Sequence, residues 1–286
     1  MTEARCPASC GELVQGWIQG SEKLVSMPIN WFSTVFVTFG QPQYHQERPM
    51  MRKALQLTLQ YFRADPQLTH GLKIEFDSTI PVAKGFASST ADIAATIMAT
   101  ARCLEQTIEE QDIVQLCAHL EPTDSTAIQP LALFDHQQGK ICERLPAAMD
   151  IDILILESPI HLETSLYHLM NRRQTLLESS EQMTRAYRTL RSGLYNPSPQ
   201  AIGEAAVMSA IENQHILRKP HFRCLLDIVE HHQLFGLNVA HSGSAVGMLF
   251  DGHAHDIERV INDIQGISAN HYPDFHLTQL IAGGVR

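Results

Sequence analysis

The chain has 286 residues and a mass of 32.0 kDa, and 44% of its residues are hydrophobic. This composition supports one large domain or two smaller ones and excludes a largely disordered chain. Lys and Arg total 21 and Asp and Glu total 31, so the formal charge of −10 excludes a general binder of nucleic acid or of anionic membranes.

Strand-like and helix-like segments follow one another along the first half of the chain. Runs of aromatic and β-branched residues indicate strands, and apolar residues at helical spacing indicate helices. We predict strands over residues 31–39 and 72–76, and helices over residues 50–63, 89–104 and 109–120. Ser89 and Asp92 resemble a capping box at the start of the alanine-rich helix predicted over 89–104.

The second half contains longer helical patterns and several short strands. Here we predict helices over residues 163–190, 199–217, 223–232 and 254–264, and strands over 151–156, 237–240, 246–250 and 275–281. Because strands and helices alternate without the regular rhythm of a parallel sheet, the pattern indicates an α+β fold with two lobes. We expect an N-terminal domain over residues 1–148 and a C-terminal domain over residues 149–286.

Neither export nor a cysteine framework is indicated. No apolar run approaches the roughly 20 residues of a membrane span, and the N-terminal residues lack an apolar signal core, so we expect a cytoplasmic protein without a membrane partner. The six cysteines form no C-x-x-C pair, and the histidines do not fall at zinc-finger spacing around them. Cys6 and Cys10 lie close together in sequence, but we predict free thiols rather than a disulfide or a metal site.

The clearest chemical signal is the segment IPVAKGFASSTA at residues 80–91, where a strand ends at proline and an apolar helix follows. Small residues such as Gly85 and Ala87 let the backbone approach an oxyanion, and a helix N-terminus adds unpaired N–H groups and partial positive charge. Polar side chains that suit a phosphate or a hydrated metal accompany them: Lys84, Ser88, Ser89 and Thr90. An ordinary capped helix is the alternative.

Two further segments carry candidate residues. The turn HSGSAVG at residues 241–247 offers Ser242 and Gly243 as a wall beside a ligand, with a tight hairpin as the alternative. The segment EPTDST, after the helix predicted over 109–120, holds Glu121 and Asp124, which can divide the tasks of metal binding and proton transfer. A solvated helix end is the alternative, but carboxylates are unfavourable beside a helix C-terminus unless they are paired.

Together and in this order, three segments resemble the motifs of the GHMP kinase superfamily. The first motif, an N-terminal strand, resembles residues 6–13 (CPASCGEL), the second resembles residues 81–90 (PVAKGFASST), and the third resembles residues 242–247 (SGSAVG). Within the superfamily, PASCGELVQG and EPTDST are most similar to the L-threonine kinases of cobalamin synthesis.

The resemblance implies a two-lobed GHMP kinase fold with the active site in the cleft between the lobes. It implies ATP and Mg²⁺ as cofactors, with Mg²⁺ held by Ser88, Ser89 and Glu121. Asp124 then lies beside the acceptor hydroxyl as the base, and Lys84 offsets charge on the phosphates. The implied nucleotide-binding residues are Pro81, Val82, Ala83, Lys84, Gly85, Phe86, Ala87, Ser88, Ser89 and Thr90.

The implied acceptor site is less complete. Ser9 and Glu12 are candidates for contacts with the acceptor, Glu12 with an ammonium group, and Ser242, Gly243 and Asp124 complete the set. Three departures from the family pattern bear on the site: Ala87 replaces a glycine, Thr90 an alanine, and Ser9 a lysine that supports the aspartate in several members.

The implied reaction is transfer of the γ-phosphoryl group of ATP to the side-chain hydroxyl of L-threonine, giving O-phospho-L-threonine for cobalamin synthesis. A homoserine kinase or another small-molecule kinase of the superfamily is the first alternative, and a non-catalytic metabolite sensor on the same fold is the second. Asp124 favours a kinase that uses a carboxylate, and the presence of Glu121 with both loop serines disfavours a sensor. The expected partners are ATP and a small-molecule acceptor, and the oligomeric state stays open.

Overall fold

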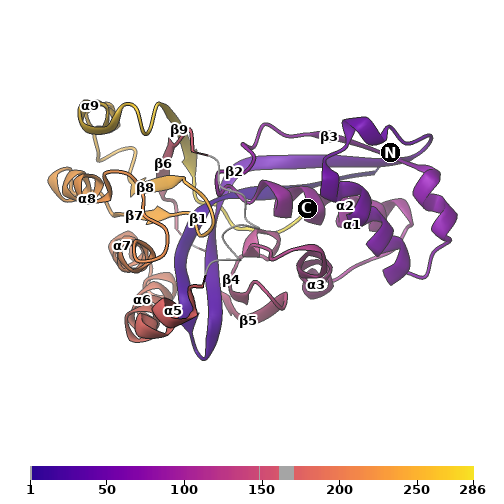
Figure 1. The fold of residues 1–286 in the computed structure, drawn as a ribbon, viewed down its shortest axis with the longest axis horizontal. Coiled ribbons are helices and arrows are strands. Elements are labelled where there is room, and N and C mark those ends of the chain that lie inside the picture. Colours follow the sequence, from indigo (N-terminus) through magenta and orange to yellow (C-terminus); the bar gives the residue numbers. More distant parts are fainter. Residues whose placement is uncertain (1, 148, 161–170) are drawn as a thin grey trace.

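One sheet of nine strands runs through the parts of the chain that the computed structural model describes, residues 2–147, 149–160 and 171–286. The strand order is β5-β4-β2-β1-β7-β8-β6-β9, and β3 also pairs with β2. The strands are β1 (Thr2–Ile18), β2 (Ser21–Phe39), β3 (Leu72–Asp77), β4 (Leu131–Asp135), β5 (Lys140–Leu145), β6 (Asp152–Glu157), β7 (Gly236–Val239), β8 (Val246–Phe250) and β9 (Asp274–Gln279) (Figure 1).

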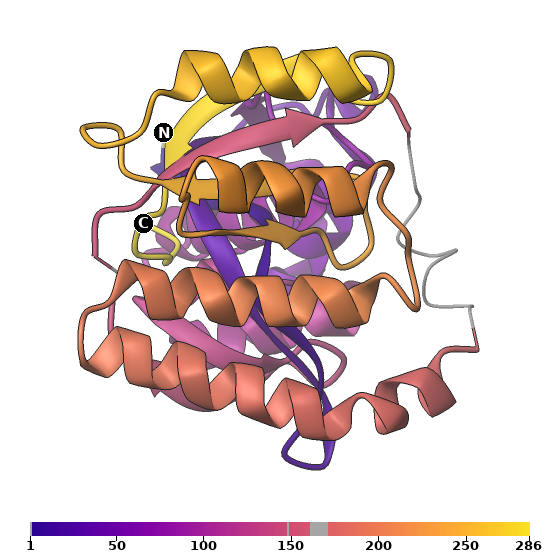
Figure 2. The same cartoon turned by 90° about the vertical axis from the view of Figure 1, so that its left-hand side faces the viewer.

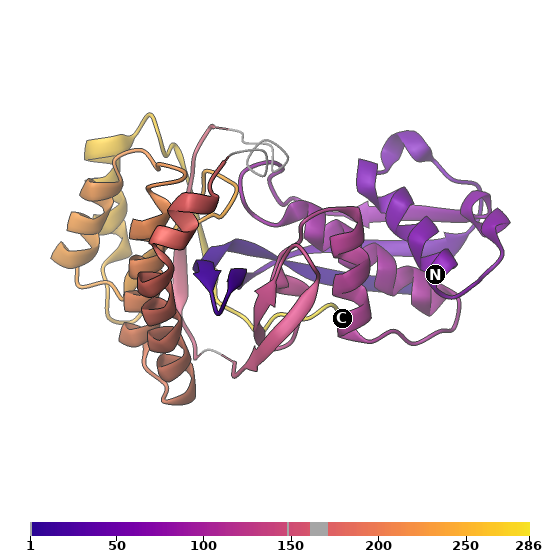
Figure 3. The ribbon, with the colours of Figure 1, turned by 60° about the horizontal axis from the view of Figure 1, so that its bottom comes forward.

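The helices pack in two groups. They are α1 (Pro49–Tyr61), α2 (Ser88–Cys103), α3 (Glu110–Leu120), α5 (Arg173–Glu178), α6 (Ser180–Tyr195), α7 (Pro199–Asn213), α8 (Phe222–His231) and α9 (Ile257–Ser268). Helices α6 to α9 lie in one layer over the strands of the C-terminal half (Figure 2). Helices α1 to α3 lie with β3 and the adjoining part of the β1–β2 hairpin at the opposite end of the molecule (Figure 3).

The long hairpin of β1 and β2 connects the two halves. Its register runs from Thr2 opposite Val37 to Ile18 opposite Ser21, and β1 pairs with β7 where Glu12 faces Val239. The register shifts on both sides of Glu12, and such irregularities bend a strand and redirect its side chains. The hairpin therefore extends one sheet through both halves and brings Glu12 to the place where they meet.

The predicted segments appear in the predicted order. Most boundaries differ by a few residues, but β2 begins at Ser21, ten residues before the strand predicted over 31–39. Strands β4 and β5 were not predicted, and β1 was indicated only by the resemblance. The helix predicted over 163–190 is divided at Ser179 between α5 and α6, and its first part falls within residues 161–170, outside the described residues. All six cysteines are free, as predicted. No helix of the described ranges is long and apolar enough to cross a membrane.

The predicted capping box at the start of α2 is wrong. The N-cap residue is Ala87, in the left-handed conformation with φ 55°, and it has no side-chain capping bond. Asp92 instead accepts hydrogen bonds from Ser33 at 2.5 Å and from Arg48 at 2.8 Å. These partners come from β2 and from the residue before α1, so tertiary packing overrides the local capping pattern.

Candidate active site

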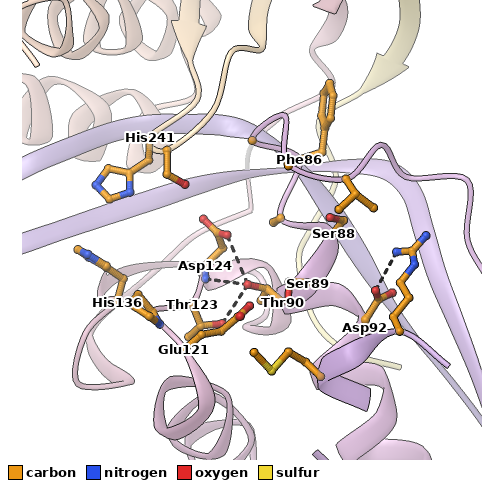
Figure 4. Close-up of a pocket in the computed structure, with 18 of the residues that line it drawn as sticks. Phe86, Ser88, Ser89, Thr90, Asp92, Glu121, Thr123, Asp124, His136 and His241 are labelled. Atoms are coloured by element: carbon orange, nitrogen blue, oxygen red, sulfur yellow. Dashed lines mark hydrogen bonds and ion pairs between the residues drawn. The ribbon is translucent and has the colours of Figure 1, made fainter. Parts of the chain in front are cut away.

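A cavity of about 550 Å³ lies where the start of α2, the segment after α3 and the turn after β7 meet. It contains most of the residues singled out in the sequence (Figure 4). The polar and charged side chains that line it are Glu12, Arg48, Ser88, Ser89, Thr90, Asp92, Glu121, Thr123, Asp124, His136, His241 and Ser242. Val82, Ala83, Gly85, Phe86 and Ala87 complete the loop side of the wall.

Two glycines allow the second and third sequence motifs to touch through their backbones. Gly85 has φ +91°, a conformation that other residues rarely adopt, and a Cβ atom on Gly243 would lie 2.3 Å from Gly85. The N–H groups of Ser244 and Ala245 both donate to the Lys84 carbonyl at 3.1 Å. The turn after β7 therefore braces the loop that begins at Pro81.

The start of α2 has the features of an anion site. Its N-cap lacks a side-chain hydrogen bond, and its first turn holds no acidic residue. Ser88 and Ser89 line the cavity at this end of the helix, where the dipole favours negative charge. A left-handed conformation at a residue other than glycine costs about 1–2 kcal/mol, so Ala87 carries strain where the N-terminus faces the cavity.

Thr90 holds Asp124 in place. Its Oγ1 accepts hydrogen bonds from the Asp124 backbone N–H at 3.2 Å and from the Thr123 hydroxyl at 3.1 Å. The same hydroxyl group donates to Asp124 Oδ2 at 3.4 Å (Figure 4). Sequence analysis assigned Thr90 to the phosphate loop, whereas in the structure its hydroxyl group orients the carboxylate.

Asp124 and Glu12 form a pair of carboxyl groups, in which Glu12 is buried and Asp124 is half-buried. Glu12 is only 3% exposed, and burial, with the neighbouring Asp124 charge, raises its pKa well above the ordinary value. Burial also raises the pKa of Asp124 from 3.8 to about 6, although hydrogen bonds from Glu12 and Thr90 lower it. The hydrogen bond between the two groups raises the pKa of Glu12 and lowers that of Asp124, so Glu12 keeps its proton longer and donates it to the Asp124 carboxylate.

A buried lysine lies under the turn after β7. The Lys219 ammonium donates to the carbonyls of Ala240 at 3.1 Å and Gly243 at 2.8 Å, and burial lowers its pKa to about 7. Glu12 is its main electrostatic partner. Sequence analysis did not single out Lys219, because only the fold brings residue 219 to this turn.

Glu121 and Ser89 place oxygen atoms together at the edge of the phosphate loop. The Ser89 side chain hydrogen-bonds to Glu121, and burial raises the pKa of the Glu121 carboxyl group. Carboxylate and hydroxyl oxygens are the ligands that Mg²⁺ prefers, and it commonly binds one or two carboxylates together with phosphate oxygens. The residues present therefore fit a magnesium ion beside bound phosphates.

Some predicted site residues lie outside the cavity lining. Lys84 forms an ion pair with Glu157, whose other oxygen contacts His276 at 2.6 Å. Ser9 is buried, and its hydroxyl oxygen accepts from the Met27 N–H at 3.1 Å within the β1–β2 hairpin. Pro81 and Gly243 do not line the cavity either, and Gly243 packs against Gly85.

Two histidines that sequence analysis did not predict lie at the opposite end of the cavity from the loop serines. His136 follows β4 and His241 follows β7, and their ring centroids are 5.0 Å apart. In Figure 4, Asp124 lies between these rings and the start of α2. The cavity thus has an anion-binding end, a carboxylate in the middle and an imidazole end.

Comparisons with known proteins bear on the family and the fold. Residues 50–133 match the family model of the GHMP kinases N terminal domain. The chain is 45% identical to an L-threonine kinase of Salmonella typhimurium, covering 99% of this chain and 94% of that protein. It is also 45% identical to an L-threonine kinase of Citrobacter freundii, covering 100% and 99%. Among solved structures, homoserine kinase from Cytophaga hutchinsonii has a TM-score of 0.72 at 15% identity, covering 100% of this chain and 96% of that one.

Proposed function

The chain belongs to the GHMP kinases, and from this membership we propose that it transfers the γ-phosphoryl group of ATP to the side-chain hydroxyl of L-threonine. The products are ADP and O-phospho-L-threonine. The observation that carries the proposal is the position of Asp124, a half-buried carboxylate between the loop serines and the far end of one cavity. The names of the relatives at 45% identity support threonine as the acceptor.

The phosphate end of the site is the loop that leads into α2. Phosphoryl transfer needs alignment and charge neutralisation more than covalent help from the protein. In this proposal the backbone around Gly85 and the uncapped N-terminus of α2 hold the phosphates of ATP. Ser88, Ser89 and Glu121 would hold Mg²⁺, which would offset the negative charge of the phosphates. Lys84 has no part in this scheme because Glu157 holds its ammonium group.

Asp124 orients the acceptor hydroxyl and takes its proton. The threonine oxygen forms a new bond to the γ-phosphorus, the bond from that phosphorus to the β–γ bridging oxygen breaks, and ADP leaves with the electron pair. Thr90 and protonated Glu12 both donate hydrogen bonds to the Asp124 carboxylate, so they fix its position before the acceptor arrives. A positioned general base contributes roughly 10²–10⁴-fold to such a step.

The biological setting is part of the proposal. The similarity of the PASCGELVQG and EPTDST segments to the L-threonine kinases supports a place in cobalamin synthesis and in the cytoplasm. The division into domains over residues 1–148 and 149–286 also stays a prediction.

An assay of ADP release tests the acceptor. Purified protein, ATP and Mg²⁺ are incubated with L-threonine, L-serine, L-homoserine and common sugars, and the product is identified by mass spectrometry. We expect the highest kcat/KM for L-threonine, with formation of O-phospho-L-threonine. Preference for homoserine contradicts the threonine assignment, and ATP binding without transfer to any alcohol supports the sensor alternative.

A further inference from the structure

The imidazole end of the cavity has no role in the transfer step described above. His136 and His241 are 2% and 7% exposed, and both line the cavity beside Asp124. If the hydroxyl of the acceptor lies between the phosphates and Asp124, the rest of the acceptor extends toward these rings (Figure 4). This reasoning rests on the proposed kinase function.

Charged residues support the His241 ring from behind. His241 Nε2 donates to Glu22 Oε1 at 3.2 Å, and Arg172 Nη2 donates to Glu22 Oε2 at 2.9 Å. Gln137 also donates to Glu22 Oε2, at 3.2 Å. Glu22 and Arg172 are each only 8% exposed, so their charges balance each other away from water. This arrangement fixes the His241 ring at the cavity wall.

An amino-acid acceptor brings a carboxylate that must find donors in this cavity, because an unpaired buried charge is costly. Among the described residues that line the cavity, the basic side chains are Arg48, His136 and His241. Arg48 is paired with Asp92 at 2.8 Å, at the opposite end from the two rings. Among the described lining residues, the histidine pair is therefore the basic group that lies on the same side of the cavity as an acceptor beyond Asp124.

We propose that His136 and His241 bind the α-carboxylate of the amino-acid acceptor, with Glu22 and Arg172 as positioning residues for the rings. The subsite selects an amino acid over a simple alcohol, while Asp124 engages the hydroxyl. Hydrogen bonds to a charged carboxylate are stronger than those between neutral groups. Because the α-carboxylate does not change during the transfer step, each imidazole contributes to acceptor binding.

A metal ion is the competing occupant of the same residues. Ligand atoms of Glu22, His136 and His241 lie within 4.8 Å of one another, which is a spacing suited to a cation. The Arg172 guanidinium lies 2.9 Å from the Glu22 carboxylate, however, and a second cation beside it is repelled. The charge of Arg172 thus disfavours a metal ion at these residues.

The test compares two acceptors that differ only in the carboxylate. Kinetics are measured with L-threonine and with L-threoninamide, which is neutral at this position, for wild-type protein, His136→Gln and His241→Gln. His253→Gln, an exposed histidine after β8, is the matched control. We expect each cavity variant to lose about 10- to 100-fold in kcat/KM for threonine, mainly through KM, and to change little with the amide. Circular dichroism and thermal melting verify that each variant is folded.

The outcomes separate the possibilities. Equal losses with both acceptors, or an unchanged preference for threonine in both cavity variants, overturn the proposed subsite alone. Stoichiometric zinc in the wild-type protein that disappears in the variants identifies a metal site and also overturns it. A wild-type protein that phosphorylates neither acceptor contradicts the kinase function, and the subsite with it.

Discussion

Replacing Asp124 with asparagine separates the catalytic role of this carboxylate from its effect on stability. Asparagine keeps the shape of the side chain and an oxygen that accepts from Thr90, but it removes the buried charge. The pKa of Asp124 rises from 3.8 to about 6. Each pKa unit corresponds to about 1.36 kcal/mol, so ionised Asp124 lowers the free energy of unfolding by about 3 kcal/mol above pH 6. We therefore expect Asp124→Asn to raise the free energy of unfolding at pH 7 by up to about 3 kcal/mol.

The pH dependence follows from the raised pKa. Below about pH 4 the carboxyl group is protonated in both the folded and unfolded chains, so the higher free energy of unfolding of the variant disappears. It grows between about pH 4 and pH 6, where the folded chain still holds the proton and the unfolded chain has lost it. Urea unfolding of both proteins across this range measures the difference directly.

The same variant must lose activity. We expect kcat to fall by roughly 10²–10⁴-fold with little change in ATP affinity, because the base is removed and the phosphate loop is not. Three results would refute the assignment of Asp124 as a base with a raised pKa. They are a variant less stable than wild type at pH 7, a stability difference that does not vary with pH, and a kcat near the wild-type value.

Three further predictions test other parts of the site. Thr90→Val removes the hydroxyl that orients Asp124, so kcat falls at least about tenfold while the KM for ATP is unchanged, and Thr90→Ser restores most of the rate. Glu121→Gln raises the Mg²⁺ concentration needed for half-maximal rate, measured by magnesium titration at fixed ATP, and an unchanged requirement removes Glu121 from the metal site. In Gly85→Ala the new Cβ lies 2.3 Å from the Ala240 Cβ, on a residue with a left-handed backbone conformation. We therefore expect the free energy of unfolding to fall by about 2 kcal/mol or more, which thermal melting measures. A neutral change means that the loop at Gly85 does not touch the turn after β7.

Local patterns predicted the segments whose signals are contained within one element. The spacing of apolar residues predicts the alanine-rich α2, and the small side chains before it predict the loop. Glu121 and Asp124 follow α3 directly. Strand β4 was not predicted. Its five residues are all buried and show no alternation, but β7 and β8 share that pattern and were predicted because they flank a Ser/Gly turn. The break between α5 and α6 at Ser179 also lies within a continuous helical pattern.

The parts of the site that depend on distant partners were beyond the local pattern. Lys84 belongs to the phosphate loop in sequence, but its ammonium group forms an ion pair with Glu157, 73 residues away. Asp92 has a capping spacing, but Ser33 and Arg48 engage its carboxylate. His241 meets Glu22 across 219 residues, so only the strand order of the sheet brings that pair together.

The most direct test of the whole account is a crystal structure with a non-hydrolysable ATP analogue, Mg²⁺ and L-threonine bound together. The account predicts the triphosphate over Gly85 to Ser89 at the start of α2, and the threonine hydroxyl within about 3 Å of the Asp124 carboxylate. A triphosphate bound elsewhere, or a threonine hydroxyl out of reach of Asp124, would contradict it.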